Sequence, residues 1–131
     1  MGVQVQHNLL LVITFLMLLW SWGSLLVALG DPQTNLINKG CSQYNATDLS
    51  NFNQNLNATL DDLRAQVSNK SKHFATAEEA RGADPVYAMF QCRNYLSAAD
   101  CAACFAVAAA QIRNCSAGAN GARAIYDGCF L

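Results

Sequence analysis

The chain has 131 residues, with eight basic and nine acidic side chains and a formal net charge of −1. No run of like charge is longer than the pairs Asp61-Asp62 and Glu78-Glu79, so the basic stripe of a nucleic-acid-binding protein is missing and we expect no nucleic acid partner. Six cysteines in so short a chain indicate an oxidising compartment.

The N-terminal segment differs sharply from the rest. Residues 1–30 contain no Lys, Arg, Asp or Glu, and residues 9–29 are almost wholly apolar. Small residues, Ala28 and Gly30, precede Asp31 at the positions a signal peptidase requires. We interpret residues 1–30 as a secretory signal peptide and residues 31–131 as one mature domain. The alternative is an uncleaved membrane anchor, since about 20 apolar residues can cross a bilayer.

The position of the cysteines favours export with cleavage. All six follow the apolar run, which places them in the segment that would enter an oxidising space. We therefore expect a secreted, extracellular protein, without a stable membrane anchor in its mature form.

Residues 50–67 predict an amphipathic helix. Its apolar residues recur at intervals of three and four and share one face: Phe52, Leu56, Leu60, Leu63 and Val67. Ser50 or Asp48 can cap the first turn of this helix.

Two short apolar runs follow, at residues 73–76 and 86–92, and a turn-prone segment with glycine and proline separates them. They predict a β-hairpin. Apolar side chains stand on both faces of the second run, with Tyr87 and Met89 on one of them. We expect partial burial of each face.

A second helix is predicted over residues 101–113, where alanine is abundant and Ser97 and Asp100 have the spacing of a capping box. Three cysteines near this helix fall in one broad stripe and face the same interior: Cys101, Cys104 and Cys115. Residues 122–131 read as one final strand. The order of helix, two strands, helix and strand predicts an α+β fold, with two α-helices packed on an antiparallel β-sheet in a single small domain.

Three chemistries could use the spacing of Cys92, Cys101 and Cys104. A thiol oxidoreductase places a C-x2-C pair at a helix start, but four further cysteines accompany this pair. A zinc site needs four ligands, and His73 is the one histidine after the apolar run. We expect disulfides, no metal, no cofactor and no enzymatic activity. Cys101 and Cys104 lie less than one helical turn apart, which disfavours a bond between them, and sequence alone selects no connectivity.

Four glycosylation sequons follow the apolar run, and we expect carbohydrate at Asn45, Asn57 and Asn69. At the fourth acceptor, Asn114, glycosylation is doubtful, because the neighbouring Cys115 is expected to be tied into the core.

The segment Cys92–Cys104 is a C-x8-C-x2-C element, and the sequence VYAMFQC at residues 86–92 leads into it. Together with YDGC at residues 126–129, this pattern resembles the ginkbilobin-type domain of plants, also called the salt-stress-response or antifungal domain. That domain is found in cysteine-rich secretory repeat proteins and receptor-like kinases. The similarity covers essentially the whole of residues 31–131.

The resemblance implies two helices on an antiparallel sheet and a set of three disulfides, Cys41–Cys115, Cys92–Cys101 and Cys104–Cys129. It also implies a secreted defence or stress-related binding protein of the apoplast. A second function class that it implies is an extracellular protein interaction module, so glycans and extracellular proteins are the expected partners.

The lectin-like member of the family is associated with antifungal activity and mannose binding. Its site uses an Asn after the first cysteine, the Arg of a G-A-R element and a Glu beyond the last cysteine. Here Arg123 matches the Arg, Ser42 replaces the Asn, and Leu131 is reached before the Glu position. We therefore expect a degraded sugar site at Ser42 and Arg123. The alternative interpretation of Arg123, which we favour, is a solvated strand residue or an ion-pair partner of Asp127.

Overall fold

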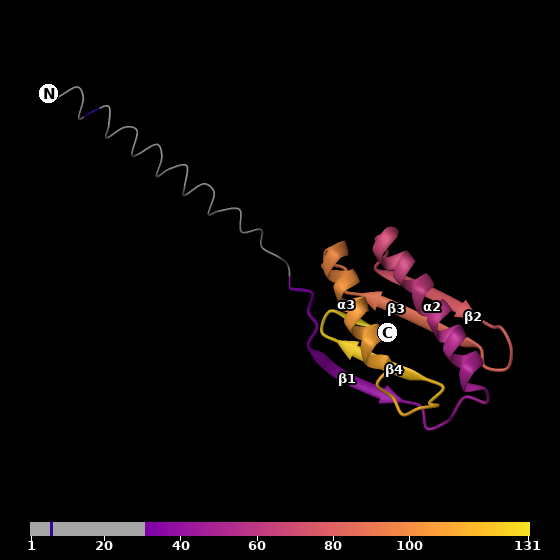
Figure 1. Ribbon diagram of the computed structural model, residues 1–131. Helices are drawn as coiled ribbons and strands as arrows, with labels where there is room; N and C mark the ends of the chain where they lie inside the picture. Colours follow the sequence, from indigo (N-terminus) through magenta and orange to yellow (C-terminus); the bar gives the residue numbers. More distant parts are fainter. Residues whose placement is uncertain (1–5, 7–30) are drawn as a thin grey trace.

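Two helices cover one face of a five-stranded antiparallel sheet in the computed structural model (Figure 1). The structure describes residues 31–131 together with Gln6, so apart from Gln6 the predicted signal peptide lies outside the described residues. In chain order the elements are β1 (Leu36–Cys41), α2 (Leu49–Asn69), β2 (Phe74–Glu79), β3 (Val86–Cys92), α3 (Ala98–Ile112), β4 (Ala122–Tyr126) and β5 (Cys129–Phe130). The predicted fold class is confirmed. Over the described part of the chain, none of the helices combines the length and hydrophobicity needed to cross a bilayer.

The strands are ordered β1-β4-β5-β3-β2 across the sheet. β2 and β3 form the predicted hairpin, in a register that runs from Phe74 opposite Gln91 to Glu79 opposite Val86. The short strand β5 is antiparallel to both of its neighbours, β3 and β4. β3 and β4 therefore run in the same direction on either side of β5.

The prediction of one final strand over residues 122–131 was wrong, and β1 was not predicted. The chain reverses at Gly128 and returns as β5, and the N–H of Gly128 donates to the carbonyl of Gln33 at 2.9 Å. A side chain at this position is excluded, since its Cβ would lie 2.7 Å from the Pro32 carbonyl. β1 is an edge strand whose side chains are nearly all exposed, so it lacks the apolar alternation by which a strand is recognised.

Each helix begins at a side-chain cap. Asp48 Oδ1 accepts from the N–H of Asn51 at 3.0 Å at the start of α2, and Ser97 Oγ accepts from the N–H of Asp100 at 3.1 Å at the start of α3. The alanines of α3 let it approach the sheet closely, and the Phe105 ring meets the Phe90 ring edge-on with centroids 5.0 Å apart.

The helices cover the inner face of the sheet alone, which corrects the expectation for residues 86–92. Tyr87 and Met89 point to the uncovered face and are 68% and 47% exposed. Val86 and Phe90, on the helix side, are buried.

Three disulfides join the elements, and they are the pairs that the family resemblance implies. Cys41–Cys115 links β1 to the segment after α3, Cys92–Cys101 links β3 to α3, and Cys104–Cys129 links α3 to β5. All six cysteines are bonded.

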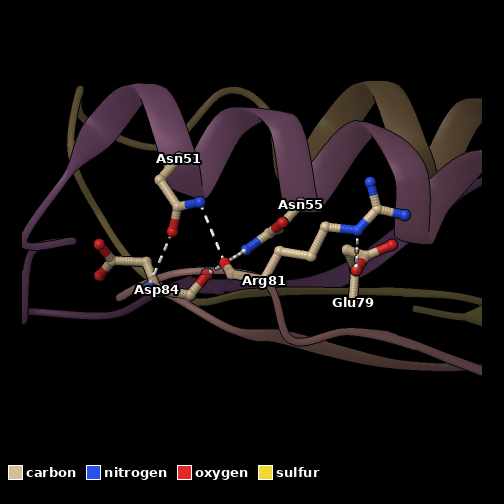
Figure 2. A network of polar contacts seen from close by, with 5 residues as sticks. All are labelled: Asn51, Asn55, Glu79, Arg81 and Asp84. Carbon is tan, nitrogen blue, oxygen red and sulfur yellow. Dashed lines mark hydrogen bonds and ion pairs between the residues drawn. The ribbon is translucent and has the colours of Figure 1, made fainter.

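A polar network fastens the β2–β3 connection to the first turns of α2 (Figure 2). Asn55 Nδ2 donates to the carbonyls of Arg81 and Asp84 at 2.7 and 2.8 Å. Asn51 also binds both residues, donating to the Arg81 carbonyl at 3.0 Å and accepting from the Asp84 N–H at 3.0 Å. Arg81 additionally pairs with Glu79, 3.0 Å away. These polar groups satisfy one another, so we assign the network a structural role.

Candidate functional site

Pairing between β1 and β4 brings the two predicted site residues together. Gly40 stands opposite Arg123 in this ladder, and just beyond it the N–H of Ser42 donates to the Gly121 carbonyl at 2.7 Å. A shallow cleft of about 320 Å³ results, and six residues line it: Gly40, Cys41, Ser42, Gly121, Ala122 and Arg123.

The Arg123 side chain lies over Gly40, where a Cβ would come within 3.1 Å of its Nε atom. Its guanidinium is exposed, and the ion pairs recorded for the described residues involve Arg64 and Arg81 only. The alternative pairing with Asp127 does not form, because that carboxylate accepts from the backbone N–H and the Nδ2 of Asn35 at 3.1 and 3.0 Å. Arg123 therefore presents a full positive charge with donors available for a ligand.

Ser42 is half-buried and lines the same cleft as Arg123. Its Oγ accepts from the N–H of Tyr44 at 3.0 Å, which fixes the oxygen and leaves the hydroxyl proton free to donate. Ser42 and Arg123 supply the polar side chains of the cleft lining, and neither is a general base at neutral pH. The arrangement can bind hydroxyl or carboxylate oxygens but offers no base for catalysis.

The predicted glycosylation sites lie on the surface. Asn45, Asn57 and Asn69 are all exposed, and Asn57 Oδ1 accepts from Arg113 Nη2 at 2.9 Å. Exposure is compatible with carbohydrate at each position, and their modification stays a prediction.

A second hollow, of about 180 Å³, lies between the two helices and the sheet. Its walls come from residues 86–89 of β3 and 119–122 around the start of β4, and its floor is apolar, with Phe52, Leu56 and Ile112. No motif or periodicity of the sequence predicts this hollow, because it forms only where both helices meet the sheet.

One titratable group near the sheet centre is perturbed. Burial raises the pKa of the Tyr126 hydroxyl above its ordinary value of 10.0, since the charged phenolate loses hydration there. Tyr126 lies outside the Ser42–Arg123 cleft.

A small sheet with helices on one face and three cross-links defines a disulfide-stabilised α+β domain. Residues 39–131 match the family model described as "Salt stress response/antifungal". The chain therefore belongs to the salt stress response/antifungal family.

The relatives are secretory, antifungal and receptor-like proteins by name. The chain is 31% identical over 97 residues to "Putative cysteine-rich repeat secretory protein 10" of Arabidopsis thaliana, covering 66% of this chain and 38% of that protein. It is 28% identical over 101 residues to "Antifungal protein ginkbilobin-like protein" of Picea abies, covering 76% of this chain and 93% of that protein.

A solved structure shows the same fold. The tandem DUF26 ectodomain of the Arabidopsis thaliana cysteine-rich receptor-like protein PDLP8 superposes with a TM-score of 0.67 and 26% identity, over 75% of this chain and 47% of that chain. The chain thus spans less than half of both Arabidopsis relatives.

Proposed function

We propose that the protein acts outside the plant cell as a stress- or defence-related binding protein. The family match supports this, as do the names of the secretory and antifungal relatives and the signal peptide expected over residues 1–30. A frame closed by three disulfides suits an oxidising extracellular space.

The proposed ligand site is the cleft at Ser42 and Arg123, and the ligand is a glycan. The observation that carries this is the exposed Arg123 side chain, which has no carboxylate partner among the described residues and lines the same cleft as Ser42. Sugar sites gain specificity from several convergent hydrogen bonds, and here two side chains contribute. We expect weak binding, with mannose among the candidates.

A glycan array of fungal and plant cell-wall sugars tests this proposal. The folded protein should bind a subset of the glycans, and Arg123→Ala should reduce that signal at least fivefold. Arg64→Ala is the matched control, since it removes an exposed guanidinium from α2 and should leave binding unchanged. If the wild type binds no glycan, or both variants lose the same signal, the glycan proposal is rejected.

Antifungal activity is a separable part of the proposal. Purified protein should slow hyphal growth, and Arg123→Ala should weaken the effect if glycan recognition underlies it. If wild type and variant inhibit growth equally, the antifungal activity does not depend on the cleft. If neither inhibits growth, the protein is not antifungal.

A second candidate function is docking of other extracellular proteins. The uncovered face of the sheet favours it, because Phe74, Tyr87 and Met89 stand exposed there on the paired strands β2 and β3, and exposed apolar patches mark interaction surfaces. The receptor-like relative is consistent with such a role.

Capture of proteins from cell-wall fluid tests docking. Wild type should retain specific partners, and the double variant Phe74→Ser, Tyr87→Ser should lose them. Val107→Ser removes an exposed apolar side chain from α3 instead and should behave as wild type. If the double variant retains the same partners as the wild type, the uncovered face is not the docking surface.

A further inference from the structure

A polar hollow lies where the ends of β3 and β4 flank β5. Its volume is about 300 Å³, and five of the residues that line it are Gln91, Arg93, Asn94, Ile125 and Phe130. We refer to it as the Arg93 hollow. It shares no lining residue with the Ser42–Arg123 cleft, so it is a separate feature of the surface.

Alternation along the strands places the Arg93 hollow on the uncovered face of the sheet. Cys92 and Cys129 point toward the helices, because each is bonded to a cysteine of α3. Their neighbours Gln91 and Phe130 therefore point outward, and these two stand opposite each other. Ile125 stands opposite Phe130 on the other side. The three side chains form one row across the outer face, with an amide at one end and apolar groups along the rest.

Arg93 borders this row beside the turn between β4 and β5. Its side chain is exposed, and its Nε donates to the Asp127 carbonyl at 3.2 Å, which fixes its position. The Asp127 carboxylate is bonded to Asn35 instead, and the ion pairs of the described residues involve only Arg64 and Arg81. Arg93 therefore keeps a positive charge without a carboxylate partner, and its two terminal nitrogens can donate to a ligand.

Arg123 lies on the same face of the sheet, because it is two residues from Ile125 along β4. At about 3.3 Å per residue, it is roughly 13 Å along the chain from Asp127, the residue to which Arg93 is bonded. The uncovered face thus carries two arginines without carboxylate partners among the described residues. The apolar side chains of Ile125 and Phe130 lie between them.

We propose that this face binds an acidic oligosaccharide, a chain of uronic acid units, across both arginines. One carboxylate of the chain pairs with Arg93 and another with Arg123, and such charge-assisted bonds are stronger than those to neutral hydroxyls. Sugar rings between them pack their apolar faces on Phe130 and Ile125, which are both half-buried. The Gln91 amide bonds the hydroxyl groups of these rings.

The surroundings favour an acidic sugar over other anionic partners. An extended peptide gains its affinity from the backbone of a sheet edge, whereas the Arg93 hollow lies over the inner strands β3, β4 and β5. Membrane surfaces and nucleic acids require larger basic clusters than two arginines. Among the outward side chains of the described strands, Glu78 is the one carboxylate, and it lies on the far edge strand β2, where its repulsion of the ligand is screened.

The inference rests on the glycan binding proposed above and names the class of ligand. The probe is tetragalacturonate, titrated into isotope-labelled protein that is expressed from the full chain and purified after secretion. In NMR spectra, the side-chain Nε–H signals of Arg93 and Arg123 should shift with the same dissociation constant. The methyl-esterified tetramer has the same backbone without the charge and should bind at least tenfold more weakly. Equal binding of acid and ester, or a shift at one arginine alone, overturns the proposal.

Substitutions provide an independent test. Arg93→Gln and Arg123→Gln should each weaken tetragalacturonate binding at least fivefold, whereas Arg64→Gln, which removes an exposed arginine from α2, should leave it unchanged. Galacturonate monomer meets one arginine at a time, so the advantage of tetramer over monomer should fall at least fivefold in Arg93→Gln. An equal loss in Arg64→Gln would show that binding follows net charge and would overturn the site. If a variant fails to fold, the comparison of acid and ester on the wild type decides.

The ligand class and the glycan-binding function can fail separately. If neutral glycans bind through Arg123 but tetragalacturonate binds no more tightly than its ester, the acidic ligand is wrong and the cleft stands. If tetraglutamate binds as tightly as tetragalacturonate and shifts the same signals, the face selects charge alone and the sugar class is wrong. If no glycan binds, both proposals fall.

Discussion

At the scale of single residues, Asn55 shows how a polar side chain can be a structural element. Its Nδ2 bonds two carbonyls of the β2–β3 connection while the residue is buried on α2. Asn55→Ala should lower the free energy of unfolding by about 2–4 kcal/mol, because two hydrogen bonds disappear and the Asp84 carbonyl stays buried. Urea denaturation measures the change.

Asn53→Ala is the matched control for that prediction. Asn53 lies on the exposed side of the same helix, so its replacement should change stability by no more than about 0.5 kcal/mol. Equal losses in the two variants would contradict the assigned role of Asn55.

Thr59 contrasts with Asn55, because its buried polar atom makes no hydrogen bond. It is 1% exposed on α2, and its Oγ1 is buried without a hydrogen-bond partner. Thr59→Val keeps the shape and removes the orphaned hydroxyl, so stability should be unchanged or rise by up to about 1 kcal/mol. Thermal unfolding of protein produced without glycosylation measures it, with Thr47→Val as an exposed control; unglycosylated protein is needed because both threonines belong to sequons. A clear loss specific to Thr59→Val would show that the hydroxyl has a partner after all.

Tyr126 predicts a dependence on pH. Burial raises its pKa in the folded state above the 10.0 of the unfolded chain, so above pH 10 the folded state binds more protons than the unfolded state. The stabilisation is complete below pH 10 and is lost as the pH rises through the folded pKa. The free energy of unfolding, measured between pH 9 and 11, should fall less steeply with pH in Tyr126→Phe than in the wild type. Parallel curves for the two proteins would contradict this.

At the scale of elements, the hairpin and both helices could be predicted because their signals are local. Asp48 and Ser97 cap the helices as their sequence context suggests, and the apolar spacing of Phe52 to Val67 marks the buried face of α2. β1 and β5 could not be predicted from the sequence, since an exposed edge strand and a two-residue strand carry no hydrophobic periodicity.

The candidate site, too, could be predicted only in part. Ser42 and Arg123 were identified through a family resemblance, and their adjacency depends on the β1–β4 register, which no spacing in the sequence reports.

The disulfides should differ in what they contribute. Cys41–Cys115 closes a separation of 74 residues and Cys92–Cys101 one of 9. Loop entropy predicts losses of about 4 and about 2.5 kcal/mol when each pair is replaced by alanines. Denaturant midpoints of the two double variants should rank in that order, and the reverse order would show that packing around Cys92 and Cys101 outweighs chain entropy.

At the scale of the whole molecule, the proposed route through the secretory pathway makes a testable prediction. Protein secreted from plant cells should begin at Asp31, contain no free thiols, and shift in gel mobility after glycosidase treatment. Edman sequencing, thiol titration and electrophoresis measure these outcomes. Retained residues 1–30 would favour the membrane anchor, and an unchanged mobility would reject carbohydrate at Asn45, Asn57 and Asn69.

The cross-links also determine what a single backbone cut can do. Cys41–Cys115 and Cys104–Cys129 overlap in sequence, so every peptide bond from Cys41 to Cys129 lies inside at least one covalent loop. One nick by an extracellular protease anywhere in this interval leaves both pieces attached, and such damage would release no fragment until the bridges are reduced.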